Sequence, residues 1–329
     1  MTATTSLIDC HVHLAALPAG DNGCFISPKL LRSPLFRFML WKHDLSRMQP
    51  QEANQRYLDH LLAELRASRH VSKAVLLGMD GFYDRTGLLN RQHTDFLVSN
   101  DYVFKTVQAY PDMFLAGPSI NPQRKDAIDE VHRCADAGAV LIKALPNAQH
   151  FNPADEKYRP FYRALAQRRL FFLSHVGYEF SLIGKDQSLG NPDRLRLALE
   201  EGVTVIAAHA CSYGLMFYEK FIPTFWELSK RYPNFYADIS AITQPHRLKM
   251  LLHLRRHPEI QSRLLFGTDY PLSVFHLAAW GRVGLGRLWN MIRTKNRFDR
   301  QVEVCKGLNL DFCSLGDMLS DPATHKDNQ

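Results

Sequence analysis

Residues 140–177 read VLIKALPNAQHFNPADEKYRPFYRALAQRRLFFLSHVG and contain two short apolar runs separated by a longer, more polar segment. The runs, Val140–Leu145 and Leu170–His175, have the length and the apolar, partly aromatic composition of buried β-strands. Their starts lie 30 residues apart, which is close to the length of one strand plus one helix. This part of the chain therefore predicts a parallel strand, a crossover helix and the next parallel strand.

The same alternation continues on both sides. Three runs precede residue 140, and three further runs start at residues 204, 235 and 263, after steps of 34, 31 and 28 residues from residue 170 onward. Eight units of this kind favour a (β/α)₈ TIM barrel over an open doubly wound sheet, because no G-x-G-x-x-G motif follows the first run. The expected strands are Leu7–His13, Ala74–Gly78, Phe114–Ser119, Val140–Leu145, Leu170–His175, Thr204–His209, Phe235–Ser240 and Arg263–Asp269.

We expect one domain over residues 1–329, although the length alone would also allow two. The barrel core is predicted over about residues 5–275. Residues 14–70, which are too long for a single crossover, are expected to form a helical cap at the barrel mouth. Residues 276–329 are expected to add C-terminal helices, with Leu288–Ile292 and Arg300–Gly307 as packing helices.

The composition is that of a globular protein, with 46% hydrophobic and 22% charged residues. Forty Lys and Arg against 33 Asp and Glu leave a net charge of +7, and no nucleic-acid-binding motif accompanies this surplus. The six cysteines form no C-x-x-C pair, which fits a reducing cytoplasm. Neither an apolar window of about 18 residues nor a signal-peptide pattern occurs. We therefore expect a cytoplasmic protein with a small-molecule substrate, without a nucleic-acid or membrane partner, and compatible with a homodimer.

Ionisable side chains gather at the ends of the predicted strands. In a TIM barrel these ends meet at one face of the molecule, where active sites lie. Burying so many ionisable groups together is costly unless something neutralises them, and a divalent cation bound by imidazole and carboxylate is the usual answer. The strand-end residues are His11 and His13 on the first run, then Lys143, His175, His209 and Asp269.

The order of these motifs resembles the amidohydrolase superfamily. The motifs are the H-x-H at residues 11–13, the SHVG that contains His175, the VIAAHACS that contains His209, and the RLLFGTDYP that contains Asp269. The most similar members belong to the amidohydrolase-related group, which includes aminocarboxymuconate semialdehyde decarboxylase. The resemblance covers roughly residues 5–275 and implies a metal-dependent TIM-barrel enzyme.

The resemblance also implies a role for each strand-end residue. His11, His13 and His175 would bind the metal, and Asp269 would be both a ligand and the proton acceptor from the metal-activated water. His209 would lie beside that water or the substrate as an electrostatic stabiliser or an acid–base group. We expect Zn²⁺ with one ion favoured, while two ions or Mn²⁺ stay open.

The chemical state of Lys143 determines whether the site holds one metal ion or two. In binuclear relatives a lysine on this strand is carboxylated and bridges two metals, and His209 would then bind the second ion. As a free ammonium, Lys143 would instead pair with Asp269 or with a substrate carboxylate. A position at the protein surface is the simplest alternative.

We expect hydrolysis of an amide, lactone or ester bond in a small molecule, either neutral or anionic. The first alternative is non-oxidative decarboxylation of an unsaturated or aromatic acid, which would require an enclosed cationic pocket. The second is a metal-binding barrel that has lost catalysis.

Other residues are weaker candidates. Asp238, on the seventh predicted strand, could hydrogen-bond an imidazole or cap a helix. On the first predicted strand, alternation places Asp9, His11 and His13 on one face. Cys10 lies on the other face and is expected to be a packing residue. Loop or cap residues that could touch substrate, but are more often core or solvated, are Asn147, His150, Tyr178, Phe25, Phe36, Phe38, Trp41, Arg32, Arg37 and Lys42. The histidines expected to be solvated are His43, His60, His70, His93, His253 and His257.

Overall fold

The computed structural model describes residues 6–179, 182, 186–215 and 218–320. The first residue of the predicted barrel core, residue 5, and the end of the predicted C-terminal segment, residues 321–329, lie outside this described part. Within it no helix is both long and apolar enough to cross a membrane.

Two parallel sheets form the barrel and meet at both edges. One has the order β1-β3-β5 and the other β10-β9-β8-β7-β6. Parallel bridges Ala116–Ala139 and Ser119–Lys143 join β5 to β6, and the bridge Val12–Tyr270 joins β1 to the segment after β10. The barrel strands are β1 (Leu7–His13), β3 (Val71–Leu77), β5 (Phe114–Gly117), β6 (Leu141–Ala144), β7 (Phe171–Ser174), β8 (Val205–Ala207), β9 (Phe235–Asp238) and β10 (Leu264–Leu265), and a separate hairpin pairs β2 (Phe25–Ile26) with β4 (Phe96–Leu97). The predicted (β/α)₈ barrel is confirmed, and every predicted strand overlaps an observed one.

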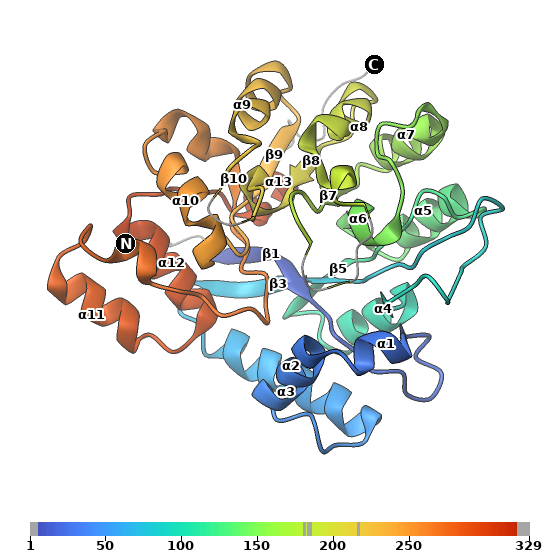
Figure 1. Cartoon of the computed structure of the whole chain (residues 1–329), viewed down its shortest axis with the longest axis horizontal. Coiled ribbons are helices and arrows are strands. Elements are labelled where there is room, and N and C mark those ends of the chain that lie inside the picture. The colour runs from blue at the N-terminus through green and yellow to red at the C-terminus, as the bar shows by residue number, and fades with distance from the viewer. Residues whose placement is uncertain (1–5, 180–181, 183–185, 216–217, 321–329) are drawn as a thin grey trace.

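Helices follow the strands and surround the barrel (Figure 1). Their apolar faces bury the outer side of the strands, which is what allows a parallel sheet to be apolar on both faces. The α-helices are α1 (Pro28–Leu31), α2 (Pro34–Lys42), α3 (Pro50–Arg66), α4 (Asn100–Ala109), α5 (Ala127–Asp136), α6 (Pro146–Gln149), α7 (Arg159–Gln167), α8 (Arg196–Glu200), α9 (Ile222–Arg231), α10 (Leu248–Leu254), α11 (Leu285–Arg293), α12 (Arg297–Gly307) and α13 (Leu315–Ser320). Short 3₁₀ helices are η1 (Glu156–Tyr158), η2 (Gln187–Gly190), η3 (Pro192–Leu195), η4 (Ala208–Cys211), η5 (Pro245–Arg247), η6 (Pro258–Arg263) and η7 (Leu277–Ala279).

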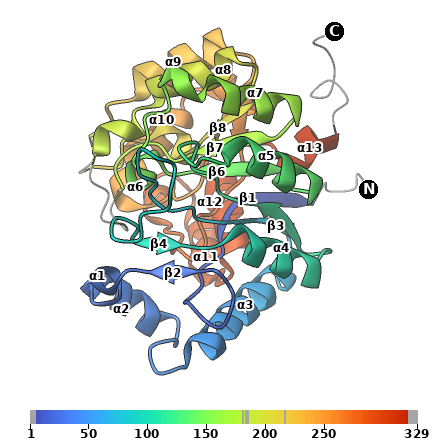
Figure 2. The ribbon, with the colours of Figure 1, turned by 90° about the vertical axis from the view of Figure 1, so that its right-hand side faces the viewer.

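The two ends of the barrel are covered differently. In Figure 2, α1 and α2 lie at the left and α13 at the right. Leu315 and Met318 of α13 join the apolar cluster that fills the barrel interior. The segment around α1 and α2 instead lines a cavity together with residues at the carboxyl ends of the strands. The carboxyl end therefore remains the open end.

A β-bulge in β1 changes which side chains face the barrel axis. The register with β3 shifts between Asp9 and Val12, so three residue steps on β1 span two on β3. Cys10 packs with Val75 in the interior cluster, and Asp9 accepts a hydrogen bond from the Thr268 hydroxyl at 2.6 Å. The prediction that simple alternation turns Cys10 away from the axis is therefore wrong, because the extra residue restarts the alternation above Cys10.

Candidate metal centre

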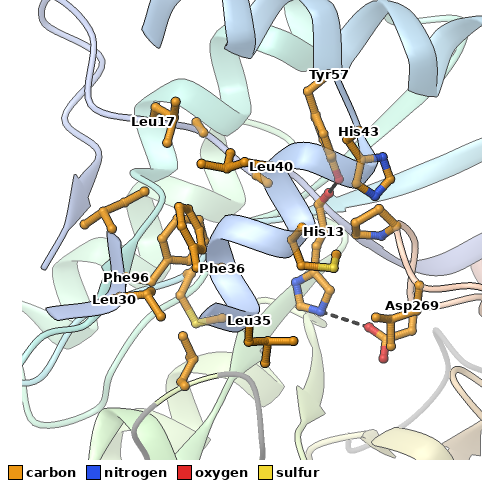
Figure 3. A pocket seen from close by; sticks show the side chains of 18 of the residues that line it. His13, Leu17, Leu30, Leu35, Phe36, Leu40, His43, Tyr57, Phe96 and Asp269 are labelled. Atoms are coloured by element: carbon orange, nitrogen blue, oxygen red, sulfur yellow. Dashed lines mark hydrogen bonds and ion pairs between the residues drawn. The ribbon is translucent and has the colours of Figure 1, made fainter. Parts of the chain in front are cut away.

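Three donor side chains meet at the carboxyl end of the barrel. The ligand atoms of His11, His13 and Asp269 all lie within 4.8 Å of one another. The Asp269 carboxylate Oδ1 is 3.0 Å from His13 Nε2 and 3.5 Å from His11 Nε2. Figure 3 shows the first of these contacts at one end of a cavity. A β-strand end and the loop after β10 thus bring together residues that are more than 250 positions apart in the sequence.

Asp238 of β9 fixes the orientation of the His11 ring. Its Oδ2 lies 2.7 Å from His11 Nδ1, and its Oδ1 accepts the backbone N–H of His209 at 2.9 Å. An ionised carboxylate only accepts, so Nδ1 of neutral His11 carries the proton and Nε2 keeps its lone pair. A carboxylate behind a ligand imidazole is the usual support of a metal site. Of the two positions that the sequence left open for Asp238, an imidazole contact or a helix cap, the structure has the imidazole contact.

A chain of hydrogen bonds sets the tautomers of His209 and His175. The Nδ1 atom of His209 lies 3.0 Å from the Ser240 carbonyl oxygen, which can only accept, so this nitrogen donates. The neutral His209 ring then accepts at Nε2, where His175 Nδ1 approaches to 3.3 Å. His175 must therefore donate from Nδ1 and keep a lone pair on Nε2. The geometry leaves that lone pair available as a third imidazole donor.

The Nε2 atom of His175 is buried without a hydrogen-bond partner among the described residues. Its nearest acidic neighbour is Glu179, whose Oε2 lies 3.7 Å away. His175 is not part of the three-residue cluster, but it lines the same cavity as His13 and Asp269, and a buried imidazole lone pair without a partner is a donor type that divalent cations bind. The residues present thus fit the group that the sequence motifs imply.

The protonation states also suit metal binding. Burial, reinforced by the Lys143 ammonium, lowers the pKa of His11 and holds the pKa of His175 well below its ordinary value. Burial and the charge of Arg247 do the same to the pKa of His209. Burial alone would raise the pKa of Asp269, but the imidazoles of His11 and His13 outweigh it and hold that pKa well below its usual range. Neutral imidazoles and an ionised carboxylate are the forms that bind metal.

Lys143 lies inside the cluster and not at the protein surface. Its side chain is fully buried, and its Nζ is 3.3 Å from His11 Nε2. Burial lowers the pKa of Lys143 to about 8. The surface alternative for this residue is therefore wrong, because β6 directs its side chain into the barrel.

The backbone is strained at two of these residues. Asp269 has φ of 64° and His209 has φ of 58°, in the left-handed region that residues other than glycine rarely adopt. Such strain costs of order 1–3 kcal/mol per residue and persists where the surroundings impose it, often at functional sites. The Asp269 N–H donates to the His11 carbonyl at 2.9 Å, which ties this conformation to the end of β1.

A cavity of about 290 Å³ opens beside the donors. Its polar end, on the right in Figure 3, has His13, His43 and Asp269. Its apolar end, on the left, has Leu17, Leu30, Leu35, Phe36, Leu40 and Phe96. Five of the six predicted strand-end residues line this one cavity, namely His13, Lys143, His175, His209 and Asp269.

The weaker candidates have mixed positions. Phe36 lines the cavity, whereas Phe38, Trp41, Arg32, Arg37 and Lys42 are exposed outside it, and Lys42 donates to the Ser273 hydroxyl at 2.8 Å. Asn147 is buried and donates to the Gln187 side chain at 2.8 Å, so a solvated position is wrong for it. His150 is exposed and, like Phe25 and Tyr178, is not among the residues that line the cavity.

His43 was expected to be solvated, and this expectation is wrong. Its side chain is buried against Tyr57, with ring centroids 6.5 Å apart, and it lines the cavity. Polar sequence neighbours such as Lys42 and Asp44 suggested solvent, but α2 ends at Lys42 and the chain turns His43 inward.

Sequence reasoning missed three further residues at the site. Ser240 touches His209 Nδ1 at 2.8 Å, Glu179 lines the cavity, and the buried Arg247 of η5 lowers the pKa of His175 and His209. The first two had a usable signal, because Ser240 ends a predicted strand and Glu179 lies four positions beyond a strand-end histidine. Arg247 had none, because it lies nine residues beyond the end of β9, in the 3₁₀ helix η5.

Comparisons with known proteins agree with this architecture. The family model described as amidohydrolase matches residues 8–283. No curated protein matches the sequence. Among solved structures, an uncharacterised TIM-barrel protein of Bordetella bronchiseptica has a TM-score of 0.57 at 18% identity and covers 92% of this chain and 96% of its own.

Two other similar structures have functional names. A putative 2-pyrone-4,6-dicarboxylic acid hydrolase of Pseudomonas putida has a TM-score of 0.54 at 15% identity and covers 95% of this chain and 93% of its own. A 5-carboxyvanillate decarboxylase of Novosphingobium aromaticivorans with bound manganese has a TM-score of 0.50 at 15% identity and covers 93% and 97%. At these identities the likeness establishes the shared fold.

Proposed function

Because the chain belongs to the amidohydrolase family, we propose that it is a metal-dependent hydrolase that cleaves an amide, lactone or ester bond of a small molecule. The observation that carries this proposal is the cluster of His11, His13 and Asp269 donor atoms within 4.8 Å at the polar end of a cavity. The orphaned Nε2 of His175 supports a third imidazole ligand. We propose a single cation, because the described residues form one such donor cluster and Lys143 as a free amine has no oxygen that could bridge to a second ion.

Each residue of the cluster has a task in such a reaction. A divalent cation in this site would lower the pKa of the attacking water and polarise the carbonyl group of the substrate. Asp269, held ionised, accepts the proton of the attacking water and later passes it to the leaving group. His209 accepts the hydrogen bond of His175 and so keeps that ligand oriented. Lys143 places a positive charge beside the carbonyl oxygen as negative charge develops there.

Decarboxylation is the alternative that the name of one structural neighbour suggests. It requires a cationic pocket around a substrate carboxylate. Lys143 is the only lysine or arginine among the described residues that line the cavity, and it shares that lining with the carboxylates of Glu179 and Asp269. The bound cation would add two positive charges to this balance, so the product test below, and not the charge of the lining, separates the two reactions.

We expect zinc- or manganese-reconstituted protein to hydrolyse members of a panel of esters, lactones and amides without releasing CO₂ from aromatic acids. A chelator should abolish this activity, and added metal should restore it, because hydrolysis depends on the bound cation. Product analysis by chromatography, with CO₂ detection in parallel, makes the distinction. CO₂ release from an aromatic acid, with no hydrolysis of any panel member, would establish the decarboxylase instead.

A further inference from the structure

The cavity beside the donors has two chemically different ends. His13, Asp269 and His43 lie at one end, and Leu17, Leu30 and Phe96 lie at the other (Figure 3). The apolar end is formed by the segment between β1 and α3 together with Phe96 of β4. A ligand that fills this cavity must therefore be polar at one end and apolar at the other.

The size of the cavity limits the apolar part. A dry cavity of ~150 Å³ lined by apolar side chains accommodates benzene, so about 290 Å³ has room for roughly twice that, or about twelve carbon atoms. Some of this space lies at the donors. An apolar group of roughly six to eight carbons, attached to a polar head, matches the remainder.

One residue of the polar end, His43, has a buried ring nitrogen, Nε2, without a hydrogen-bond partner among the described residues. Burial, together with the charges of Arg297 and Lys42, lowers the pKa of His43 to about 4, so the ring is neutral at neutral pH. A neutral imidazole nitrogen binds an uncharged hydroxyl, carbonyl or N–H group, and leaving it unpaired in the complex would cost about 1–3 kcal/mol.

The apolar end of the cavity offers no charge partner to an acid among the described residues. Glu179 and Asp269 contribute two carboxylates, and Lys143 is already close to His11. The basic residues of the cap, Arg32, Arg37 and Lys42, are exposed and do not line the cavity. A dicarboxylic substrate of the kind named for one structural neighbour could place one carboxylate at the cation, but its second carboxylate would meet the apolar wall.

We propose that the substrate is a neutral ester or amide with a medium-length apolar group, which lies between the cap and the barrel while its polar head contacts His43. This inference rests on the proposed hydrolase for the position of the reacting carbonyl, at His13 and Asp269. The apolar group determines which substrates bind, and α1 and α2 form the wall that limits the length of this group.

Binding of non-reacting methyl ketones tests the proposed ligand class without requiring turnover. For zinc-loaded protein, calorimetry should give an affinity that rises about three- to fourfold with each CH₂ from 2-butanone toward 2-octanone and then levels off as the cavity fills. Octanedioate should bind more weakly than 2-octanone. Affinity that is independent of chain length, or tighter binding of octanedioate, would overturn the proposal.

Adjacent leucines of α1 offer a matched pair of variants. Leu30 lines the cavity and is 4% exposed, whereas Leu31 is 41% exposed and does not line it. Leu30→Phe should shift the preferred ketone to a shorter chain, and Leu31→Phe should leave the chain-length profile unchanged. Equal effects of the two substitutions would contradict the assignment of the wall.

His43→Leu tests the polar contact separately. It should weaken 2-octanone binding about two- to tenfold, the range of one neutral hydrogen bond, and leave benzene binding unchanged. A parallel loss of benzene binding would indicate a collapsed cavity, and the polar contact would then be rejected. If the ketones bind as expected while no p-nitrophenyl ester or anilide of any chain length is hydrolysed, the ligand class stands and the proposed hydrolase fails.

Discussion

Asp269→Asn should lower kcat by about 10²- to 10⁴-fold while the protein stays folded and keeps most of its bound metal. The amide cannot accept the proton that the ionised carboxylate accepts, yet it retains one oxygen at the same place. Asparagine is also among the residues that best tolerate the left-handed conformation, so φ of 64° at this position adds no new strain. Steady-state kinetics, elemental analysis and the thermal midpoint Tm measure the three expectations.

Asp238→Asn is the matched control, because Asp238 is buried next to the same histidine but does not line the cavity. Loss of this support should weaken metal affinity or activity about 10- to 100-fold, and excess metal should recover part of the activity. Asp269→Asn should not be rescued in this way. Near-normal turnover of Asp269→Asn with one of the best panel substrates would show that another group accepts the proton.

His175→Ala should lose both the metal and the activity. The hydrogen bond to His209 leaves a lone pair on His175 Nε2, and this buried atom has no hydrogen-bond partner among the described residues. Without it, two imidazoles and one carboxylate remain, and a cation held by fewer protein ligands dissociates more readily. Elemental analysis after gel filtration measures the metal, and the ester assay measures activity.

His132→Ala serves as the control for this substitution, because His132 lies on α5 in the outer helical layer. It should retain metal and activity at wild-type levels. If His175→Ala still binds metal as tightly as the wild type, His175 is not a ligand and other side chains bind the metal.

The strands were predictable from sequence because each is a short apolar run bounded by polar residues, and the regular steps indicated closure into a barrel. Membership of the amidohydrolase family, inferred from the ordered motifs, is confirmed. The face of each side chain was harder to predict. The bulge in β1 restarts alternation after Cys10, and nothing in the sequence LIDCHVH marks the extra residue.

Local sequence also fails where tertiary contacts decide exposure. His43 is surrounded by charged sequence neighbours but turns inward after α2, and Arg247 reaches the site from η5, beyond the end of β9. The cap was expected from the length of residues 14–70, and Phe36 was one of several cap residues named as able to touch substrate. The rest of the apolar wall could not be predicted, because it depends on how α1 and α2 lie over the strand ends. The roles of Asp269, His209 and Lys143 stay predictions that the variants above test.

Metal stoichiometry tests the central claim most directly, namely that the strand ends hold one divalent cation used for hydrolysis. We expect zinc-reconstituted protein, freed of loose metal by gel filtration, to contain about one ion per chain by elemental analysis, as for a mononuclear site with three imidazoles and one carboxylate. Two ions per chain would contradict the single-cation site and point to a carboxylated Lys143. No more than trace metal, with no binding of added zinc or manganese, would contradict the metal-dependent enzyme altogether.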